Sequence, residues 1–205
     1  MWNVQREMSN VCCSDPHLAR SSLNMPSVCV FCGSSVGNDE VFASAAKELG
    51  RLLAGNNCTL IYGGGKVGLM GIVADEVLRN SGKVIGVIPH FLYQREVGHD
   101  GLSQLEIVES MHERKKRMAD LSDAFIAMPG GWGTLDELAE ILTWRQLGLV
   151  KSPVGVLNTA LFFNPLIEQL QQMTSKGFVS ESNSKTLIVA KEPAELLTRL
   201  GVVAA

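Results

Sequence analysis

The sequence lacks the features by which several classes of protein are recognised. Its 205 residues include 18 Lys and Arg against 21 Asp and Glu, a formal net charge of −3, so no basic excess is available for a nucleic-acid backbone. No apolar run reaches the roughly 18 to 20 residues that a membrane span needs. His90, His99 and His112 do not have metal-ligand spacing. We therefore expect no nucleic-acid partner, no membrane association and no metal.

The cysteines are few, and their placement argues against a disulfide framework. The sequence has five, an odd number, and no secretory h-region precedes them, so a reducing, cytoplasmic setting is expected. Cys29 and Cys32 form a CxxC, but "SVCVFCG" has the pattern of a strand rather than of a turn that opens a helix. Residues three apart on a strand point to opposite faces. The pair is therefore predicted to be two buried structural thiols.

What the sequence does have is a regular alternation of apolar runs and amphipathic stretches. Residues 1–26 show neither period and are expected to form a loose tail, with one domain over residues 27–205. Strands are predicted over 28–32, 59–62, 84–88, 105–110, 124–128, 153–157 and 186–190. Helices are predicted over 39–54, 69–81, 110–122, 134–148, 162–175 and 193–200. Such an alternation predicts a single Rossmann-like, doubly wound α/β domain, with a parallel sheet of about seven strands and helices on both faces.

Four segments with chemistry-bearing residues follow the predicted strands. They are "CGSS" at 32–35, "YGGGKVGLMG" at 62–71, "PHFLYQREVGH" at 89–99 and "PGGWGT" at 129–134. In an open α/β sheet, ligands bind beyond the carboxyl ends of the strands. Since two of the four segments are glycine clusters, we expect them to form one site at this edge.

Two familiar glycine loops do not fit this sequence. Gly63-x-Gly65-x-x-Gly68 matches the dinucleotide fingerprint as a string, but no carboxylate stands at the end of the next strand to hold a ribose. Gly82-Lys83 lacks the other residues of a phosphate-binding P-loop. A nicotinamide, flavin or nucleoside triphosphate ligand is therefore disfavoured.

The "MPGGWGTLDE" stretch fits a simpler anion site. A strand that ends at Met128, a glycine turn and a helix that opens near Thr134 would direct free amide N–H groups and a positive dipole end at one point. Glycine allows the backbone to approach an anion because it has no Cβ. A phosphate suits that point. The alternative is a tight strand-to-helix turn that binds nothing.

Two glutamates have capping-box spacing, and the sequence alone does not decide the role of one of them. Ser110 and Glu113 are predicted to cap a helix, whereas Glu137, three residues after Thr134, is equally a cap or a site residue. In the second case its apolar helix neighbours would raise the pKa of its carboxyl group. In the basic run that follows Glu113, Arg114 is placed to hold a phosphate or a carboxylate at the ligand edge.

Together, "PGGWGTLDE", "YGGGKVGLMG" and "MHERK" resemble the LONELY GUY (LOG) family of cytokinin riboside 5′-monophosphate phosphoribohydrolases. The resemblance runs from about Ser27 to the last helix and includes "SDAFIAMPGG", "LTWRQLG" and "PVGVLN". The tail has no counterpart in these motifs, and Trp132 fills a variable position. Proteins with PGGxGTxxE have also been labelled lysine decarboxylases, but this chain is short for a pyridoxal-phosphate fold and shows no Schiff-base lysine context.

The resemblance implies an enzyme that hydrolyses the N-glycosidic bond of N6-modified adenosine monophosphates without a cofactor, giving the free base and ribose 5-phosphate. It implies Arg114 and Glu137 as the catalytic pair. It also implies a homo-oligomer, typically a dimer, with the site near the subunit interface. The substrate-binding residues expected from the resemblance and from the glycine turns are Glu96, Lys115, Gly130, Gly131, Trp132, Gly133, Thr134, Thr143, Gly64 and Gly65.

Two alternatives stay open at this point. One is a broader nucleosidase that acts on AMP and other purine monophosphates. The other is a non-catalytic protein on the same scaffold that binds a nucleotide or the molybdenum cofactor. An intact Arg114 and Glu137 pair favours catalysis over the second alternative.

Overall fold

The computed structural model describes residues 25–204 except Val97, and the side chains of Arg95 and Glu96 are also outside the description. Most of the expected tail therefore lies outside the described residues. The strands are β1 Ser27–Phe31, β2 Thr59–Tyr62, β3 Val84–Pro89, β4 Gln104–Val108, β5 Ala124–Ala127, β6 Val154–Leu157 and β7 Leu187–Ala190. The helices are α1 Glu40–Gly55, α2 Gly68–Arg79, α3 His90–Glu96, α4 Met111–Asp120, α5 Trp132–Gln146, α6 Asn164–Ser175, α7 Glu181–Ser184 and α8 Pro193–Arg199, with a 3-10 turn η1 at Thr159–Leu161.

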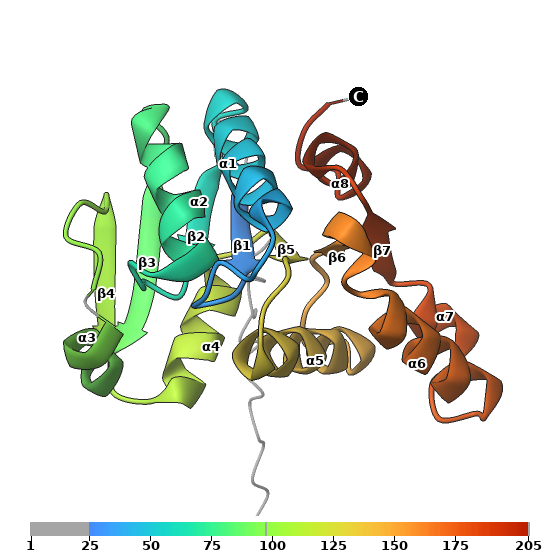
Figure 1. Cartoon of the computed structure of the whole chain (residues 1–205). Helices are drawn as coiled ribbons and strands as arrows, with labels where there is room; N and C mark the ends of the chain where they lie inside the picture. The colour runs from blue at the N-terminus through green and yellow to red at the C-terminus, as the bar shows by residue number, and fades with distance from the viewer. Residues whose placement is uncertain (1–24, 97, 205) are drawn as a thin grey trace, which may run out of the picture.

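The strands form one parallel sheet in the order β4-β3-β2-β1-β5-β6-β7 (Figure 1). The order runs outward from β1 in both directions, so β1 and β5 are neighbours although β2, β3 and β4 lie between them in the chain. This arrangement confirms the predicted doubly wound α/β fold. The point between β1 and β5 is the switch point, where such sheets leave a crevice for ligands.

The core has two layers because the central strands are buried on both faces. One layer packs α1, α2 and α8 against the sheet and contains Cys32, whereas the other packs α4, α5 and α6 and contains Cys29 (Figure 1). The two cysteines are buried free thiols on opposite faces, as predicted. Near-continuous apolar strands such as Val84–Pro89, buried at every position, are what a sheet covered on both sides requires.

The main differences from the predicted elements are two short helices that were not predicted and the start of α5. No helix was predicted within 89–99, but His90–Glu96 forms α3, a helix of 7 residues that is too short to show a clear amphipathic period. α7 was missed for the same reason. α5 begins at Trp132 rather than near Thr134, because Gly131 takes the N-cap position. No helix in the described ranges combines the length and the apolar character that a membrane span requires.

Candidate functional site

The loops that follow β1, β2 and β5 meet at the carboxyl edge of the sheet. The Gly33 N–H donates a hydrogen bond to the Pro129 carbonyl at 3.1 Å, and the Gly33 carbonyl accepts one from the Leu69 N–H at 3.0 Å. These two bonds join three of the four segments that the sequence placed at this edge. The predicted convergence of the glycine clusters is therefore confirmed.

The first glycine of the β5 turn is required by packing. A Cβ built on Gly130 would meet the Gly33 nitrogen at 2.8 Å and would collide with the Thr134 hydroxyl. Real Cβ atoms do not approach other atoms this closely, so only glycine lets these two loops touch. Gly130 thus fixes the position of the turn from which α5 begins.

Gly131 and Gly133, by contrast, face open space. A Cβ built on either residue would meet no heavy atom within 4 Å, and neither residue has a positive φ. Packing and backbone conformation therefore do not require glycine at these two positions. Gly131 is the N-cap of α5, and no side chain caps this end of the helix. The bare backbone at this N-terminus is the kind of site where an anion binds.

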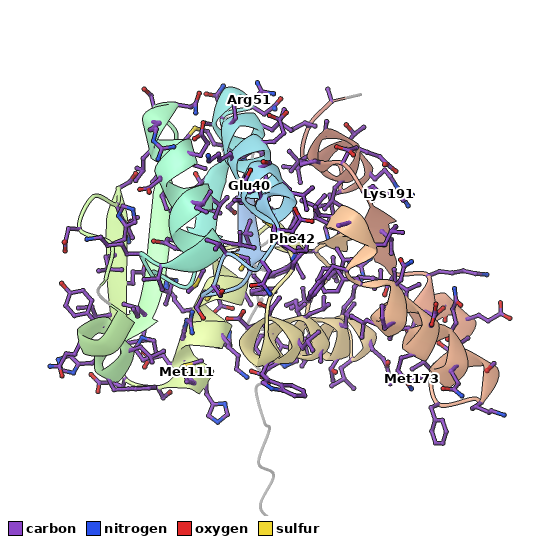
Figure 2. All side chains as sticks on the ribbon, in the orientation of Figure 1. Glu40, Phe42, Arg51, Met111, Met173 and Lys191 are labelled. Carbon is purple, nitrogen blue, oxygen red and sulfur yellow. The ribbon has the colours of Figure 1, made fainter. Side chains whose placement is uncertain are left out.

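A cavity of about 230 Å³ lies beside this turn. Its walls include Ser34 and Ser35 from the loop after β1, together with Gly130 and Gly131. Phe42 from α1, labelled in Figure 2, also lines the cavity and packs edge-on against Phe162, with ring centroids 6.0 Å apart. The lining thus combines serines and glycines with two aromatic residues.

Arg114 lies under the loop that follows β2. The residue is 7% exposed, and its guanidinium group donates hydrogen bonds from Nε to the Val87 carbonyl at 3.2 Å and from Nη2 to the Gly63 carbonyl at 3.3 Å. A Cβ on Gly63 would collide with Nη2, so this glycine makes room for the arginine. The backbone of β3 and of the loop after β2 thus holds Arg114 in one orientation.

Glu137 is the titratable group at the centre of the site. Its side chain is 11% exposed, and Oε1 lies 4.0 Å from Nη2 of Arg114. Within the described part of the chain, its carboxyl group makes no hydrogen bond. Burial raises its pKa to about 7; the nearby carboxylates of Asp136 and Glu140 add to the rise, and the charges of Arg114 and Lys115 oppose it. The group therefore changes its protonation state near neutral pH.

The structure answers the capping question for both glutamates. Ser110 accepts a hydrogen bond from the Glu113 N–H at 3.1 Å, and the Glu113 carboxylate accepts one from the Glu109 N–H at 2.9 Å, so this predicted cap is confirmed. Thr134 is not a cap, since it lies inside α5, and Glu137 faces Arg114 instead of the start of its helix.

Lys115 joins α4 to α5. Its side chain is 12% exposed, and Nζ lies 3.1 Å from Oδ2 of Asp136 and 3.2 Å from Oε1 of Glu140. Burial by itself would lower the pKa of Lys115, but the hydrogen bonds to the two carboxylates outweigh it and leave this pKa above its usual value. Lys115 is thus a fixed cation beside the Glu137 carboxyl group.

The remaining predicted residues lie at the border of the site or away from it. Trp132 is 88% exposed at the start of α5, and Thr143 is exposed two turns after Glu137, with its hydroxyl donating to the Ala139 carbonyl. This chain does not bring Thr143 and Glu137 together. Glu96 ends α3, and its side chain lies outside the described residues.

Gly64 and Gly65 have structural partners. Gly64 has a φ of 75°, a conformation that favours glycine, and its carbonyl accepts a hydrogen bond from the His99 N–H at 3.3 Å. Gly65 forms an isolated antiparallel bridge with Gly98. These two glycines hold the segment that follows α3 against the loop after β2.

Sequence reasoning missed three residues that shape the site. Asp136 and Glu140 hold Lys115, and their spacing of four residues on α5, on either side of Glu137, is a signal that could have indicated them. Gly63 was considered only as part of a dinucleotide fingerprint. Its role as the space for Arg114 has no local sequence signal, because the two residues are 51 positions apart.

The fold and the site together define a Rossmann-like α/β protein with a buried carboxyl–arginine pair at its switch point. A family model described as "Possible lysine decarboxylase" matches residues 70–200. The chain is 46% identical over 173 residues to a probable cytokinin riboside 5′-monophosphate phosphoribohydrolase, LOGL2, of Oryza sativa subsp. japonica, covering 84% of this chain and 71% of the relative. It is 44% identical over 173 residues to cytokinin riboside 5′-monophosphate phosphoribohydrolase LOG1 of Arabidopsis thaliana, covering 84% of this chain and 81% of that relative. The chain belongs to this LOG family of phosphoribohydrolases, as the sequence motifs indicated.

Solved structures with the same fold include proteins with other titles. The molybdenum cofactor binding protein of Rippkaea orientalis superposes with a TM-score of 0.68 at 21% identity, covering 90% of this chain and 100% of that one. The Moco carrier protein of Chlamydomonas reinhardtii gives a TM-score of 0.66 at 22% identity, covering 87% of this chain and 96% of that one. At this identity the likeness concerns the fold alone.

Proposed function

We propose that the chain hydrolyses the N-glycosidic bond of N6-modified adenosine 5′-monophosphates, the cytokinin riboside monophosphates, and releases the free base and ribose 5-phosphate. The observation that carries the proposal is the Glu137 carboxyl group, which is buried, has a pKa of about 7 and lies 4.0 Å from Arg114. Most O-glycoside hydrolases use a carboxyl group beside the anomeric carbon, and by analogy such a group suits an N-glycosidic bond. Relatives at 44 to 46% identity carry the name of this activity.

The phosphate of the substrate is proposed to bind at the start of α5. The Gly130–Thr134 turn offers backbone N–H groups and the positive end of the helix dipole, and Gly131 and Gly133 leave their backbone open to a ligand. The loop that contains Gly64 and Gly65 is proposed to contact the same phosphate group. Binding energy at the phosphate would then place C1′ of the ribose against Glu137.

The bond-breaking step then follows from the charges at C1′. As the C1′–N9 bond breaks, its electron pair goes to N9 of the base and positive charge develops on the ribose. An ionised Glu137 stabilises this charge and accepts a proton from the attacking water, whose oxygen bonds to C1′. Glu137 then returns this proton, directly or through a water molecule, to a ring nitrogen of the departing base, so that the base leaves neutral and Glu137 is ionised again. Arg114 orients the Glu137 carboxylate or the substrate and balances the negative charge.

The experiment is an assay of base release with three substrates. The purified protein is incubated with N6-isopentenyladenosine 5′-monophosphate, with AMP and with the unphosphorylated riboside. Release from the first alone supports the proposal, whereas equal release from AMP indicates the broader nucleosidase. No release from any substrate indicates a non-catalytic carrier. Glu137→Gln should retain the fold and lose most turnover, and full turnover in a folded Gln variant would exclude Glu137 as the catalytic carboxyl group.

We further propose that the chain acts as a homodimer in the cytoplasm, with the site near the subunit interface. Large apolar side chains are exposed at both ends of α5, at Trp132 and at Leu147, which is 65% exposed, and a second copy would bury them. Thr143, on the same helix, would then bind the substrate in the site of the partner subunit. The described cysteines are all free thiols, which suits a reducing compartment. Light scattering at several protein concentrations tests the assembly.

A further inference from the structure

Two helices bring charges of opposite sign together around the catalytic carboxyl group. α4 supplies two consecutive cations, Arg114 and Lys115, and α5 supplies Asp136, Glu137 and Glu140. These residues come from two segments more than twenty positions apart, and the sheet brings them into contact. How the two cations are shared among the three carboxyl groups determines the charge that Glu137 experiences.

The structure distributes the two cations unequally among the three carboxyl groups. Nζ of Lys115 lies within 3.2 Å of a carboxylate oxygen of Asp136 and of Glu140. Glu137 is left with Arg114 at 4.0 Å, beyond hydrogen-bond distance. The Arg114 guanidinium group is itself held by hydrogen bonds to backbone carbonyls of β3 and of the loop after β2. The catalytic carboxyl group is thus the one that lacks a hydrogen-bonded cation.

We propose that Asp136 and Glu140 are positioning residues that hold the Lys115 ammonium group away from the Glu137 carboxyl group. The inference rests on the proposed function of Glu137. Without these two carboxylates, Glu137 is the carboxyl group left for Lys115 to pair with, because it lies between Asp136 and Glu140 in the sequence of α5 and already experiences the charge of Lys115. A paired Glu137 would be a weaker base.

The electrostatic surroundings of Glu137 agree with this assignment. The titratable and charged groups that face it are Arg114, Lys115, Asp136, Glu140, Cys29 and Cys32. Burial raises the pKa of both thiols well above the usual value, so both are neutral and add no charge at neutral pH. The two flanking carboxylates raise the pKa of Glu137, and the two cations lower it. Removing the carboxylates therefore shifts this pKa downward twice over, once directly and once through the released Lys115.

The experiment compares the pH dependence of kcat/KM in Asp136→Asn, Glu140→Gln and the double variant. The natural protein should gain activity as the pH rises through about 7, as Glu137 ionises. In the double variant the midpoint of this rise should fall by roughly one pH unit, a tenfold change in the proton dissociation constant, with smaller shifts in the single variants. A loss of stability without a shift of the midpoint would indicate a merely structural ion pair and would overturn the proposal.

A matched control lies on α4, the helix that carries Lys115. Lys116 pairs with Asp120 at 2.6 Å, and both side chains are about half exposed or more. Asp120→Asn therefore removes one carboxylate from one lysine, as Glu140→Gln does, but away from Glu137. Its pH profile should superimpose on that of the natural protein. A shift in this control as large as that of Glu140→Gln would mean that general charge, and not the position of Lys115, sets the midpoint.

A second readout needs no turnover. In protein labelled with ¹³C-glutamate, the carboxyl resonance of Glu137 is assigned by its loss in Glu137→Gln and is then followed against pH. The titration midpoint should fall in the double variant, and an unchanged midpoint in folded protein would refute the positioning role. Absence of base release would instead count against the proposed function and leave this titration intact. If the double variant does not fold, the single variants carry the same test.

Discussion

Replacing Glu137 with Gln should stabilise the fold, and the gain should depend on pH. The pKa of Glu137 in the native state is about 7, against an ordinary value of 4.5. Between these two values the unfolded chain has lost the proton that the native state keeps. Since the native state binds more protons, the free energy of unfolding falls as the pH rises through this window. The natural protein therefore becomes less stable between pH 4.5 and 7, and the penalty is constant above pH 7.

The magnitude follows from the size of the pKa difference. One pKa unit corresponds to about 1.4 kcal/mol, so the whole shift corresponds to about 3 kcal/mol at pH 7 and above. A side chain that is 11% exposed is shielded from solvent, so most of this figure should be observed. Gln has nearly the same shape but no charge, and it avoids the penalty. Its amide needs a hydrogen-bond partner, which offsets part of the gain.

The assay is urea denaturation of the natural protein and of Glu137→Gln at a series of pH values from 4.5 to 8. The difference in the free energy of unfolding should be small at pH 4.5 and should approach about 3 kcal/mol at pH 7.5. Glu195→Gln is the control, since Glu195 is half exposed on α8 at the other face of the sheet. The difference in the free energy of unfolding between this variant and the natural protein should not increase between pH 4.5 and 7.5. A difference that stays constant across the series would falsify the raised pKa of Glu137.

Three further predictions follow from the glycine turns and from Arg114. Gly63→Ala should abolish most activity, because its Cβ collides with the Arg114 guanidinium group; base-release kinetics on folded protein test this. Gly130→Ala should lower the free energy of unfolding by about 1 to 3 kcal/mol, because its Cβ overlaps Thr134 and the neighbouring loop; urea denaturation measures it. Gly131→Ala should leave this free energy nearly unchanged but raise KM for the monophosphate at least several-fold, and an unchanged KM would place the phosphate elsewhere.

The fold could be predicted because its information is local. Each buried strand is a short apolar run such as Thr59–Tyr62, and long helices such as α1 have an amphipathic period, so the alternation indicates a doubly wound sheet. The short helices α3 and α7 were missed because they contain too few turns for a period. The start of α5 was placed two residues too late because Gly131, which has no capping side chain, occupies the N-cap.

The site could be predicted only in part. The resemblance to the LOG family indicated Arg114 and Glu137 as the catalytic pair, whereas spacing alone left Glu137 equally a cap or a site residue. The apolar neighbours of Glu137 predicted the raised pKa that burial produces in the structure. The pairing of Lys115 with Asp136 and Glu140 depends on the approach of α4 to α5, which no local pattern reports. Substrate binding by Thr143 stays a prediction, since this residue lies away from Glu137 in the chain described above.

The strand order has one consequence for how the molecule can be divided. β1 to β4 and α4 build one side of the sheet and carry Arg114, whereas β5 to β7 and α5 build the other and carry Glu137. The short link between Asp120 and Ala124 is the border between these two portions. Two fragments produced by a cut in this link would each hold one member of the pair. Base release would then report the reassembly of the fragments, because neither contains the complete pair alone.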